Sequence, residues 1–256
     1  MRAARALVTA LGLLAAWQVL VWVSGVPPYI LPGPLSVGRA LAAQPLLLLH
    51  HAAITLAEIL LGMGLGSLIG ACSAVLLAVS GVAQRWLMPV LVVSQALPVF
   101  ALAPLLVLWL GYGMASKVAM AVLIIYFPVT AAYLDGLRRT EPGWLELART
   151  MDANPLGILR HIRIPAALPA LTSGLRVAAA VAPIGAVVGE WVGSSGGLGF
   201  IMLHANARMQ VDLMFAALLL LAAMALALWL AIDRAGRALT RWQPDASATG
   251  SPGVRP

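Results

Sequence analysis

Six apolar runs, each close to the length that crosses a lipid bilayer, dominate this sequence. They are Ala6–Ser24, Ala52–Val79, Leu87–Leu110, Val118–Leu134, Ala166–Val188 and Leu213–Ile232. A transmembrane helix needs about 20 mostly apolar residues. Helices suit such runs because the backbone N–H and C=O groups must find partners within the segment when lipid surrounds it. The sequence therefore predicts an all-α, polytopic membrane protein with six transmembrane helices.

The charge content supports the same conclusion. Charged residues make up 10% of the 256 residues and hydrophobic residues 62%, whereas a soluble domain carries about 25% charged residues. The net charge is +7, and Lys117 is the only lysine. The basic residues lie at the ends of the apolar runs, which indicates a bilayer and argues against a nucleic-acid partner. Cys72 is the single cysteine, so an intramolecular disulfide is excluded.

The distribution of basic residues predicts the orientation of the chain. If the N-terminus is cytoplasmic, twelve of the 16 basic residues face the cytoplasm, and Arg39, Lys117 and Arg208 lie outside. The positive-inside rule thus predicts cytoplasmic N- and C-termini. The first run is expected to be retained, because no convincing small-residue cleavage site follows it. We expect residues 1–240 to form one transmembrane domain and the polar, Pro/Gly-rich tail 241–256 to be disordered.

Small residues and prolines inside the runs suggest how the helices pack. The spacing of Gly62, Gly66 and Gly70 at i, i+4 and i+8 predicts close approach to a neighbouring helix. Proline interrupts the backbone hydrogen bonds of a helix. Pro98 and Pro104 in the third run and Pro183 in the fifth run therefore fit either kinks around a cavity or ordinary kinks.

Two acidic residues are candidates for the substrate path. Glu58 lies within the second run and Glu190 follows the fifth. Ionisable residues in membrane segments commonly mark a pathway, so Glu58, Glu190 and the three prolines form the predicted path. The alternative for Glu58 is a partner on a neighbouring helix, and for Glu190 an interfacial acid beside Trp191.

The polar segment between the fourth and fifth runs, about residues 138–165, is predicted to form two short cytoplasmic helices. Thr140 is expected to cap a helix that carries Glu141 and Pro142 in its first turn. Trp144, Leu147, Ala148 and Met151 then share one apolar face. Asn154 followed by Pro155 is a second helix start. Such a loop either docks on a partner or lies on the membrane surface.

The residues of this loop resemble a known motif. Glu146-Leu147-Ala148, then Asp152, then nine residues to Ile162-Arg163-Ile164-Pro165, is similar to the "EAA…G…I-LP" loop of bacterial ABC importer permeases. The resemblance extends over about residues 50–240. It implies that the loop is a coupling helix that docks in a groove of an ATPase subunit. The implied coupling residues are Trp144, Glu146, Leu147, Ala148, Met151, Asp152, Ile162 and Pro165.

The loop departs from that motif at two positions. Leu147 replaces the first alanine, and Asp152 stands where the family usually has glycine. A turn between two helices often needs a left-handed residue, which glycine supplies freely and aspartate tolerates at a cost. We therefore expect the turn to be kept, with a negative charge close to the ATPase contact.

The resemblance also implies the partners of the chain. They are a second copy of the chain, two cytoplasmic ATPase subunits and an external solute-binding protein, in a bacterial inner membrane. We expect the chain to bind no cofactor and to be no enzyme, with ATP and Mg used by the partner ATPase. The stretch "GYGMASKV" has Ser116 and Val118 where a P-loop needs glycine and Ser/Thr. Lys117 is therefore expected to be an external residue that transport does not require.

The predicted substrate also comes from the resemblance. The stretches "QALPVFALAPLLVLWLGYG", "RVAAAVAPIGAVVGEWVGSSGGLGF" and "MLHANARMQ" look most like permeases for hydroxymethylpyrimidine and related thiamine precursors. Sulfonate, taurine or nitrate is the alternative. Glu58 and Glu190 would repel such anions, which weakly favours an amino-pyrimidine.

Two other classes of protein remain as alternatives. Gly193–Gly196 with His204 matches the G-x-S-G pattern of intramembrane serine proteases, but the glycines are adequately explained as turns in an external loop. A secondary transporter is disfavoured because the sequence has no internal repeat. His50 and His51 lack a third ligand at metal spacing, so no metal site is predicted.

Overall fold

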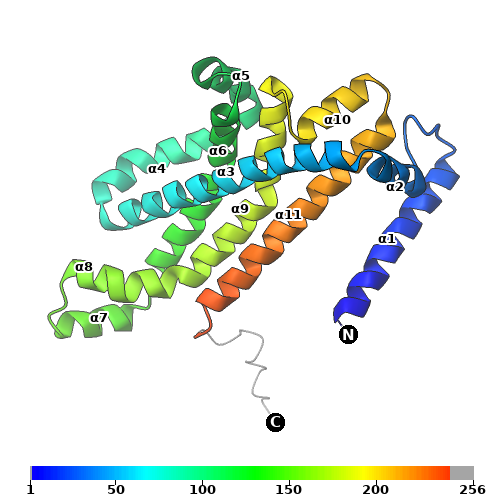
Figure 1. Ribbon diagram of the computed structural model, residues 1–256. Coiled ribbons are helices and arrows are strands. Elements are labelled where there is room, and N and C mark those ends of the chain that lie inside the picture. Colours follow the sequence, from blue (N-terminus) through cyan, green and yellow to red (C-terminus); the bar gives the residue numbers. More distant parts are fainter. Residues whose placement is uncertain (1, 243–256) are drawn as a thin grey trace, which may run out of the picture. The chain divides into compact units, whose positions relative to one another are not determined.

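The computed structural model describes residues 2–242, and these residues fold into helices without a strand. The helices are α1 (Arg2–Ser24), α2 (Pro34–Ala43), α3 (Pro45–Val79), α4 (Gly81–Ala96), α5 (Val99–Leu110), α6 (Met114–Arg138), α7 (Pro142–Thr150), α8 (Pro155–Ile158), the π-helical turn η1 (Leu159–Arg163), α9 (Ile164–Gly193), α10 (Leu198–Ala207) and α11 (Val211–Leu239). Figure 1 follows them from blue to red. The predicted all-α membrane fold is confirmed.

Within residues 2–242, four helical segments are long and apolar enough to cross a membrane, and a bent pair of helices adds a fifth if the pair is counted as one span. The four are α3, α6, the segment Pro155–Gly193 and α11, and the pair is α4 with α5. The predicted count of six differs at two places. The apolar part of α1, Val8–Ser24, is a shorter helix, and the third predicted run is interrupted.

Proline explains the interruption of the third run. The sequence predicts one helix over Leu87–Leu110, whereas α4 ends at Ala96 and α5 begins at Val99. Pro98 is the N-cap residue of α5, with extended backbone angles. Proline disfavours the helical conformation of the residue before it, so Leu97 cannot continue α4 easily. Pro104 and Pro183, by contrast, lie inside the continuous helices α5 and α9.

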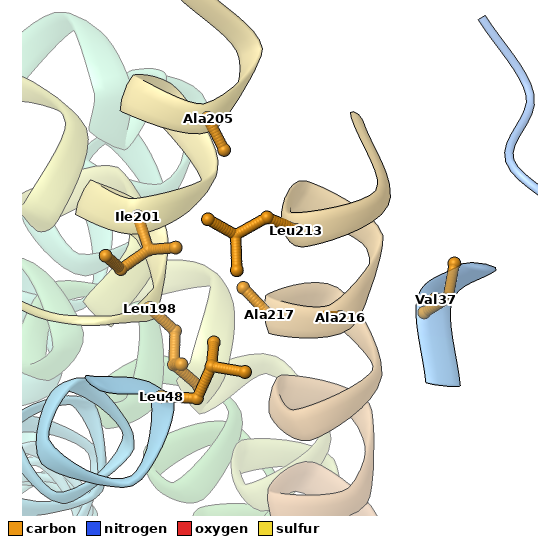
Figure 2. Close-up of a cluster of buried hydrophobic side chains, with 8 residues drawn as sticks. All are labelled: Val37, Leu48, Leu198, Ile201, Ala205, Leu213, Ala216 and Ala217. Atoms are coloured by element: carbon orange, nitrogen blue, oxygen red, sulfur yellow. The ribbon is translucent and has the colours of Figure 1, made fainter. Parts of the chain in front are cut away.

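The described chain divides into two compact units. The first contains residues 1–65, 97–124 and 181–226, and the second contains 66–96, 125–180 and 227 onward. In the first unit, α10 and α11 pack through Leu198, Ile201 and Leu213 (Figure 2). Ala216 and Ala217 belong to the same cluster, and their small side chains allow the helices to approach closely.

Small residues also pack the helices of the second unit. A methyl group added to Gly136 of α6 would lie 2.6 Å from the Ala170 side chain of α9. One added to Gly174 of α9 would lie 3.0 Å from the Pro128 carbonyl oxygen of α6. Asp233 of α11 pairs with Arg176 of α9 at 2.9 Å. These contacts hold α6, α9 and α11 together within the unit.

The predicted glycine stripe on α3 is buried along its whole length. Gly62 faces Ala121 of α6 in the first unit. A methyl group added to Gly70 would lie 2.6 Å from the Tyr126 carbonyl oxygen, in the second unit. The predicted disordered tail, 241–256, lies outside the described residues from residue 243 onward.

Candidate functional site

The first helix of the α7–α8 loop begins one residue later than the sequence predicts. Its N-cap is Glu141, with Pro142 in its first turn. The Thr140 hydroxyl instead donates a hydrogen bond to the Leu137 carbonyl oxygen at 3.3 Å. Because proline favours the first helical position, Pro142 leaves the cap position to the residue directly before it. The expectation that Thr140 caps this helix is therefore wrong.

The turn after α7 has the geometry that the sequence predicts. Asp152 adopts a left-handed conformation, with φ of 56°. Its N–H donates to the Arg149 carbonyl oxygen at 3.0 Å, and the Ala153 N–H donates to the Ala148 carbonyl oxygen at 3.0 Å. The Asn154 side chain then accepts a hydrogen bond from the Gly157 N–H at 2.6 Å and caps α8. Asp152 thus takes the conformation that glycine adopts most easily.

The side chains of α7 divide into an exposed and a buried group. Trp144, Leu147 and Met151 are exposed to 52%, 61% and 74%. Ala148 is buried, at 6% exposure, but it lines the same hollow as these three side chains, in agreement with the predicted shared face. Glu146 and Asp152 are exposed, and Ile162 and Pro165 are half-buried.

A cavity of about 700 Å³ opens behind these residues, within the second unit. Six of the eight predicted coupling residues line it, namely Trp144, Leu147, Ala148, Met151, Ile162 and Pro165. Trp242, which follows α11, also lines the cavity and has no counterpart in the sequence prediction. The structure therefore gathers the two halves of the predicted motif, about 15 residues apart in the chain, around one hollow.

Arg163 attaches the second half of the loop to α6. Its Nε and Nη2 donate to the Leu137 carbonyl oxygen at 3.1 and 3.0 Å. That oxygen belongs to the last turn of α6, where carbonyl groups lack partners within the helix. A guanidinium group there also interacts favourably with the negative end of the helix dipole.

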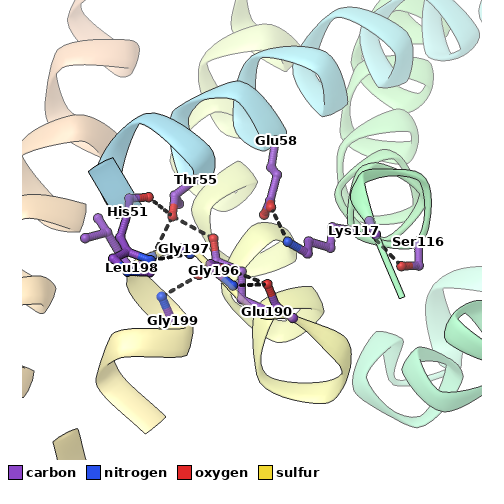
Figure 3. Close-up of polar contacts among 12 residues, drawn as sticks. His51, Thr55, Glu58, Ser116, Lys117, Glu190, Gly196, Gly197, Leu198 and Gly199 are labelled. Carbon is purple, nitrogen blue, oxygen red and sulfur yellow. Dashed lines mark hydrogen bonds and ion pairs between the residues drawn. The ribbon is translucent and has the colours of Figure 1, made fainter. Parts of the chain in front are cut away.

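Glu58 forms a buried ion pair in the first unit (Figure 3). The Lys117 Nζ lies 2.7 Å from the Glu58 Oε1, and both side chains are buried. The alternative for Glu58, a partner on a neighbouring helix, is what the structure contains. The sequence predicts that Lys117 lies on the external side and that transport does not require it; the structure adds that its side chain is buried in this pair. A buried charge needs such a partner to offset its lost hydration.

Glu190 is also buried, at 1% exposure, and both of its oxygens are occupied. The Thr55 hydroxyl donates to Oε1 at 2.6 Å, and the Gly199 N–H donates to Oε2. Trp191, its neighbour, is half exposed. Glu190 is therefore not the interfacial acid that one sequence interpretation describes.

Two of the three prolines of the predicted path differ in burial from Glu58 and Glu190. Pro98 and Pro104 are exposed, whereas Pro183 is buried in α9. A smaller cavity of about 200 Å³ is lined by Lys117 and by Tyr112, Gly113, Gly193, Ser194 and Ser195. Lys117 lines this cavity, whereas Glu58 and Glu190 do not.

Sequence reasoning missed His51 and Thr55. A signal was available, because His51, Thr55 and Glu58 follow each other at i, i+4 and i+7 and so share one face of α3. His51 had been considered as part of a metal pair with His50. In the structure its Nδ1 accepts a hydrogen bond from the Gly197 N–H at 2.9 Å.

The residues of the protease alternative are not joined to one another. The serine of the G-x-S-G pattern, Ser195, is exposed, and the hydroxyl of its neighbour Ser194 bonds within the loop, to the carbonyl oxygen and N–H of Gly196. The His204 Nδ1 contacts the Phe200 carbonyl oxygen at 2.9 Å. A serine nucleophile needs a base within hydrogen-bond reach, and these contacts do not provide one.

The sequence of this chain matches a known protein family. Residues 62–243 match the family model described as "Binding-protein-dependent transport system inner membrane component". The matched range includes α6, the whole α7–α8 loop, α9 and α11.

Several relatives align over most of the chain. A probable ABC transporter permease protein of Haemophilus influenzae is 59% identical, over 86% of this chain and 90% of its own. A formylaminopyrimidine transport permease protein of Halalkalibacterium halodurans is 35% identical, over 90% and 92%. A riboflavin transport system permease protein of Chloroflexus aurantiacus is 39% identical, over 92% and 89%.

A solved structure has the same fold. It shows inward-facing conformations of the MetNI methionine ABC transporter, and the matching chain has 24% sequence identity and a TM-score of 0.68. The alignment covers 77% of this chain and 99% of the other.

Proposed function

Because this chain belongs to the family of binding-protein-dependent transport system inner membrane components, the permeases of ABC importers, we propose that it carries a small nitrogen heterocycle into the cell. The proposed substrate is hydroxymethylpyrimidine or a related thiamine precursor. An external binding protein delivers it, and ATP hydrolysis by a separate subunit drives its passage.

The observation that carries the ATP-driven part of this proposal, docking on a separate ATPase subunit, is the exposed apolar face of α7. Trp144, Leu147 and Met151 present large apolar surfaces beside the charged Glu146 and Arg149. A helix of nine residues is too short to be stable alone in water. The left-handed Asp152 and the Asn154 cap define where the helix ends and the next begins. Such a presented face supports docking on a partner protein, the cytoplasmic ATPase.

The proposed assembly contains two copies of this chain and two ATPase subunits. Closure of the ATPases on ATP brings the two α7 helices together and opens the path to the outside. Hydrolysis by the ATPases then returns the path to the inward-facing state. This chain contributes the path and the docking helices, and it uses no ATP or Mg of its own. The excess of basic residues supports cytoplasmic termini.

The relatives support the substrate class. The names of two of them refer to formylaminopyrimidine and riboflavin transport, and both compounds are nitrogen heterocycles. The acidic residues Glu58 and Glu190 add less support than the sequence suggests, because both are buried and already bonded. The substrate proposal therefore rests on the relatives, whereas the docking proposal rests on the α7 face.

Uptake by the reconstituted transporter tests the substrate. The chain, its ATPase and its binding protein are placed in liposomes, and labelled hydroxymethylpyrimidine, riboflavin, taurine and nitrate are supplied with and without ATP. We expect ATP-dependent uptake of hydroxymethylpyrimidine. Uptake of taurine or nitrate in its place would assign the chain to the anion-transporting branch. Ion-driven uptake without the ATPase would make it a secondary transporter.

A further inference from the structure

The N-terminus of α10 is held by side chains from two other helices. The first amide groups of a helix have no acceptor within the helix. At α10 the Gly197 N–H donates to His51 Nδ1 at 2.9 Å and the Leu198 N–H donates to the Thr55 hydroxyl at 2.8 Å. The Gly199 N–H donates to Glu190 Oε2. We call His51, Thr55 and Glu190 the α10 anchor (Figure 3).

Two members of the α10 anchor, Thr55 and Glu190, also bind each other. The Thr55 hydroxyl accepts from Leu198 and donates to Glu190 Oε1 at 2.6 Å. Its single proton and a lone pair are thus both used. His51 must present an unprotonated Nδ1 to the Gly197 N–H, so its ring carries the proton on Nε2. Thr55 and Glu190 therefore form one connected pair, in which removal of the Thr55 hydroxyl breaks two bonds.

The fit around the anchor leaves no space for a larger residue. Gly197 has φ of +111°, a conformation that residues with a side chain rarely adopt, and a methyl group there would overlap the Glu190 carboxylate. A methyl group at Gly199 would lie 2.7 Å from Glu190 Oε2. Leu198 and Ile201 bury the other side of the same helix end. α10 is thus attached through both polar and apolar contacts.

The C-terminal end of α10 is exposed and partly polar, unlike its buried N-terminal end. Residues 206–210 are exposed and include Asn206, Arg208 and Gln210. In a chain that is 62% hydrophobic, this exposed polar stretch suits contact with water or a water-soluble protein better than contact with lipid. With cytoplasmic termini, the segment that follows α9 lies on the external side, where the binding protein arrives.

We propose that Thr55 and Glu190 are positioning residues that attach α10 to α3 and α9, so that α10 presents a constant face to the substrate-loaded binding protein. This inference rests on the proposed function. Glu190 then acts without contact with the substrate. Its two oxygens are occupied by Thr55 and Gly199, and its role is to hold the helix that receives the delivering protein.

The test compares Thr55→Val, which removes the hydroxyl at nearly constant shape, with Thr55→Ser, which keeps it. Uptake into liposomes is measured against the concentration of loaded binding protein, per assembled transporter. We expect Thr55→Val to raise the half-saturating concentration about fivefold or more, since two buried bonds are lost, with the maximal rate kept. Thr55→Ser should behave as wild type. Glu190→Gln should give a smaller rise, because the amide keeps one acceptor oxygen.

Two further measurements decide the interpretation. Hydrogen exchange of the amides at 197–199 should be faster in Thr55→Val than in Thr55→Ser. Thr172→Val serves as the matched control, because the hydroxyl of the buried Thr172 donates to the Pro169 carbonyl oxygen of its own helix. A loss of assembled transporter with an unchanged half-saturating concentration would overturn the proposal, as would wild-type behaviour of Thr55→Val. Failure of the proposed function would appear differently, as absent uptake by the wild-type transporter, and the exchange contrast would still test the anchor.

Discussion

The α7–α8 loop exposes its distinctive side chains, whereas the cluster around Glu190 buries them. Trp144, Leu147 and Met151 face outward from α7, while Glu58 and Glu190 are 0% and 1% exposed. An apolar face that residues 2–242 leave largely exposed in a polar loop indicates another protein as its partner. A buried charge has its partners within the chain and so indicates internal positioning. The comparison predicts opposite outcomes for substitutions in the two regions.

Leu147→Asp should have the largest effect on transport. It places a charge at the centre of the exposed α7 face, and desolvating an unpaired charge costs several kcal/mol. At about 1.4 kcal/mol per tenfold, the ATPase should bind at least a hundredfold more weakly. Co-purification with the ATPase measures the loss. Because Leu147 is 61% exposed, the thermal stability of the isolated chain should stay unchanged.

Leu147→Met is the matched control, since it keeps an apolar side chain of similar size. Ala148→Asp makes a poorer probe, because Ala148 is buried and the new charge would destabilise the chain itself. A Leu147→Asp chain that binds its ATPase and transports normally would show that the loop only lies on the membrane.

Lys117→Ala should have the largest effect on stability. It leaves Glu58 buried without its cation, and breaking a buried pair from one side costs about 3–5 kcal/mol. The loss should appear as a lower melting temperature in detergent, with uptake falling as the folded fraction falls. Adding Glu58→Gln should recover much of it, because the buried charge is then removed. A Lys117→Ala chain as stable as wild type would mean that the pair contributes nothing.

The two regions also differ in how much of them could be predicted from sequence. The helix ends at Asp152 and Asn154 follow from residues a few positions apart, so local patterns were sufficient. Lys117 is 59 residues from Glu58 and Thr55 is 135 residues from Glu190, and no local pattern shows that these side chains meet. Thr55 and His51 were within reach, since their spacing from Glu58 places them on one helix face.

The number of spans could be predicted only in part, because it depends on backbone geometry as well as on hydropathy. Hydropathy located all the apolar runs, but it does not record backbone geometry. Pro98 therefore split a run that reads as continuous. The burial of Ala148 depends on which side of α7 meets the rest of the second unit. The position of Trp242 in the cavity lining likewise depends on tertiary packing, because Trp242 follows α11 and is far in sequence from the α7–α8 loop.

Arg163→Ala should have an intermediate effect, confined to the attachment of the loop. It removes two hydrogen bonds from a charged donor to the Leu137 carbonyl oxygen, and bonds of this type contribute about 1.5–3 kcal/mol. We expect faster amide exchange over residues 155–165 and weaker ATPase binding. Arg163→Lys should recover part of the effect, because a lysine keeps the charge but loses the forked geometry. Equal behaviour of both variants and wild type would exclude this attachment.

Asp152→Gly should have the smallest effect and the opposite sign. Asp152 has φ of 56°, a conformation that costs a residue with a side chain roughly 1–2 kcal/mol. Glycine avoids that cost but loses more conformational entropy on folding, so the net gain should be at most about 1 kcal/mol. The measurement is the melting temperature of the assembled transporter together with its uptake rate.

Asp152→Asn separates the effect of backbone conformation from the effect of charge, because asparagine also tolerates the left-handed conformation but carries no charge. If only glycine improves assembly, the left-handed backbone conformation at position 152 is what limits assembly in the wild type. If glycine and asparagine improve it equally, the negative charge beside the docking face is what weakens the ATPase contact, and the departure from the family motif acts through electrostatics. A loss of coupling in both variants would instead make the Asp152 carboxylate a contact that the ATPase uses.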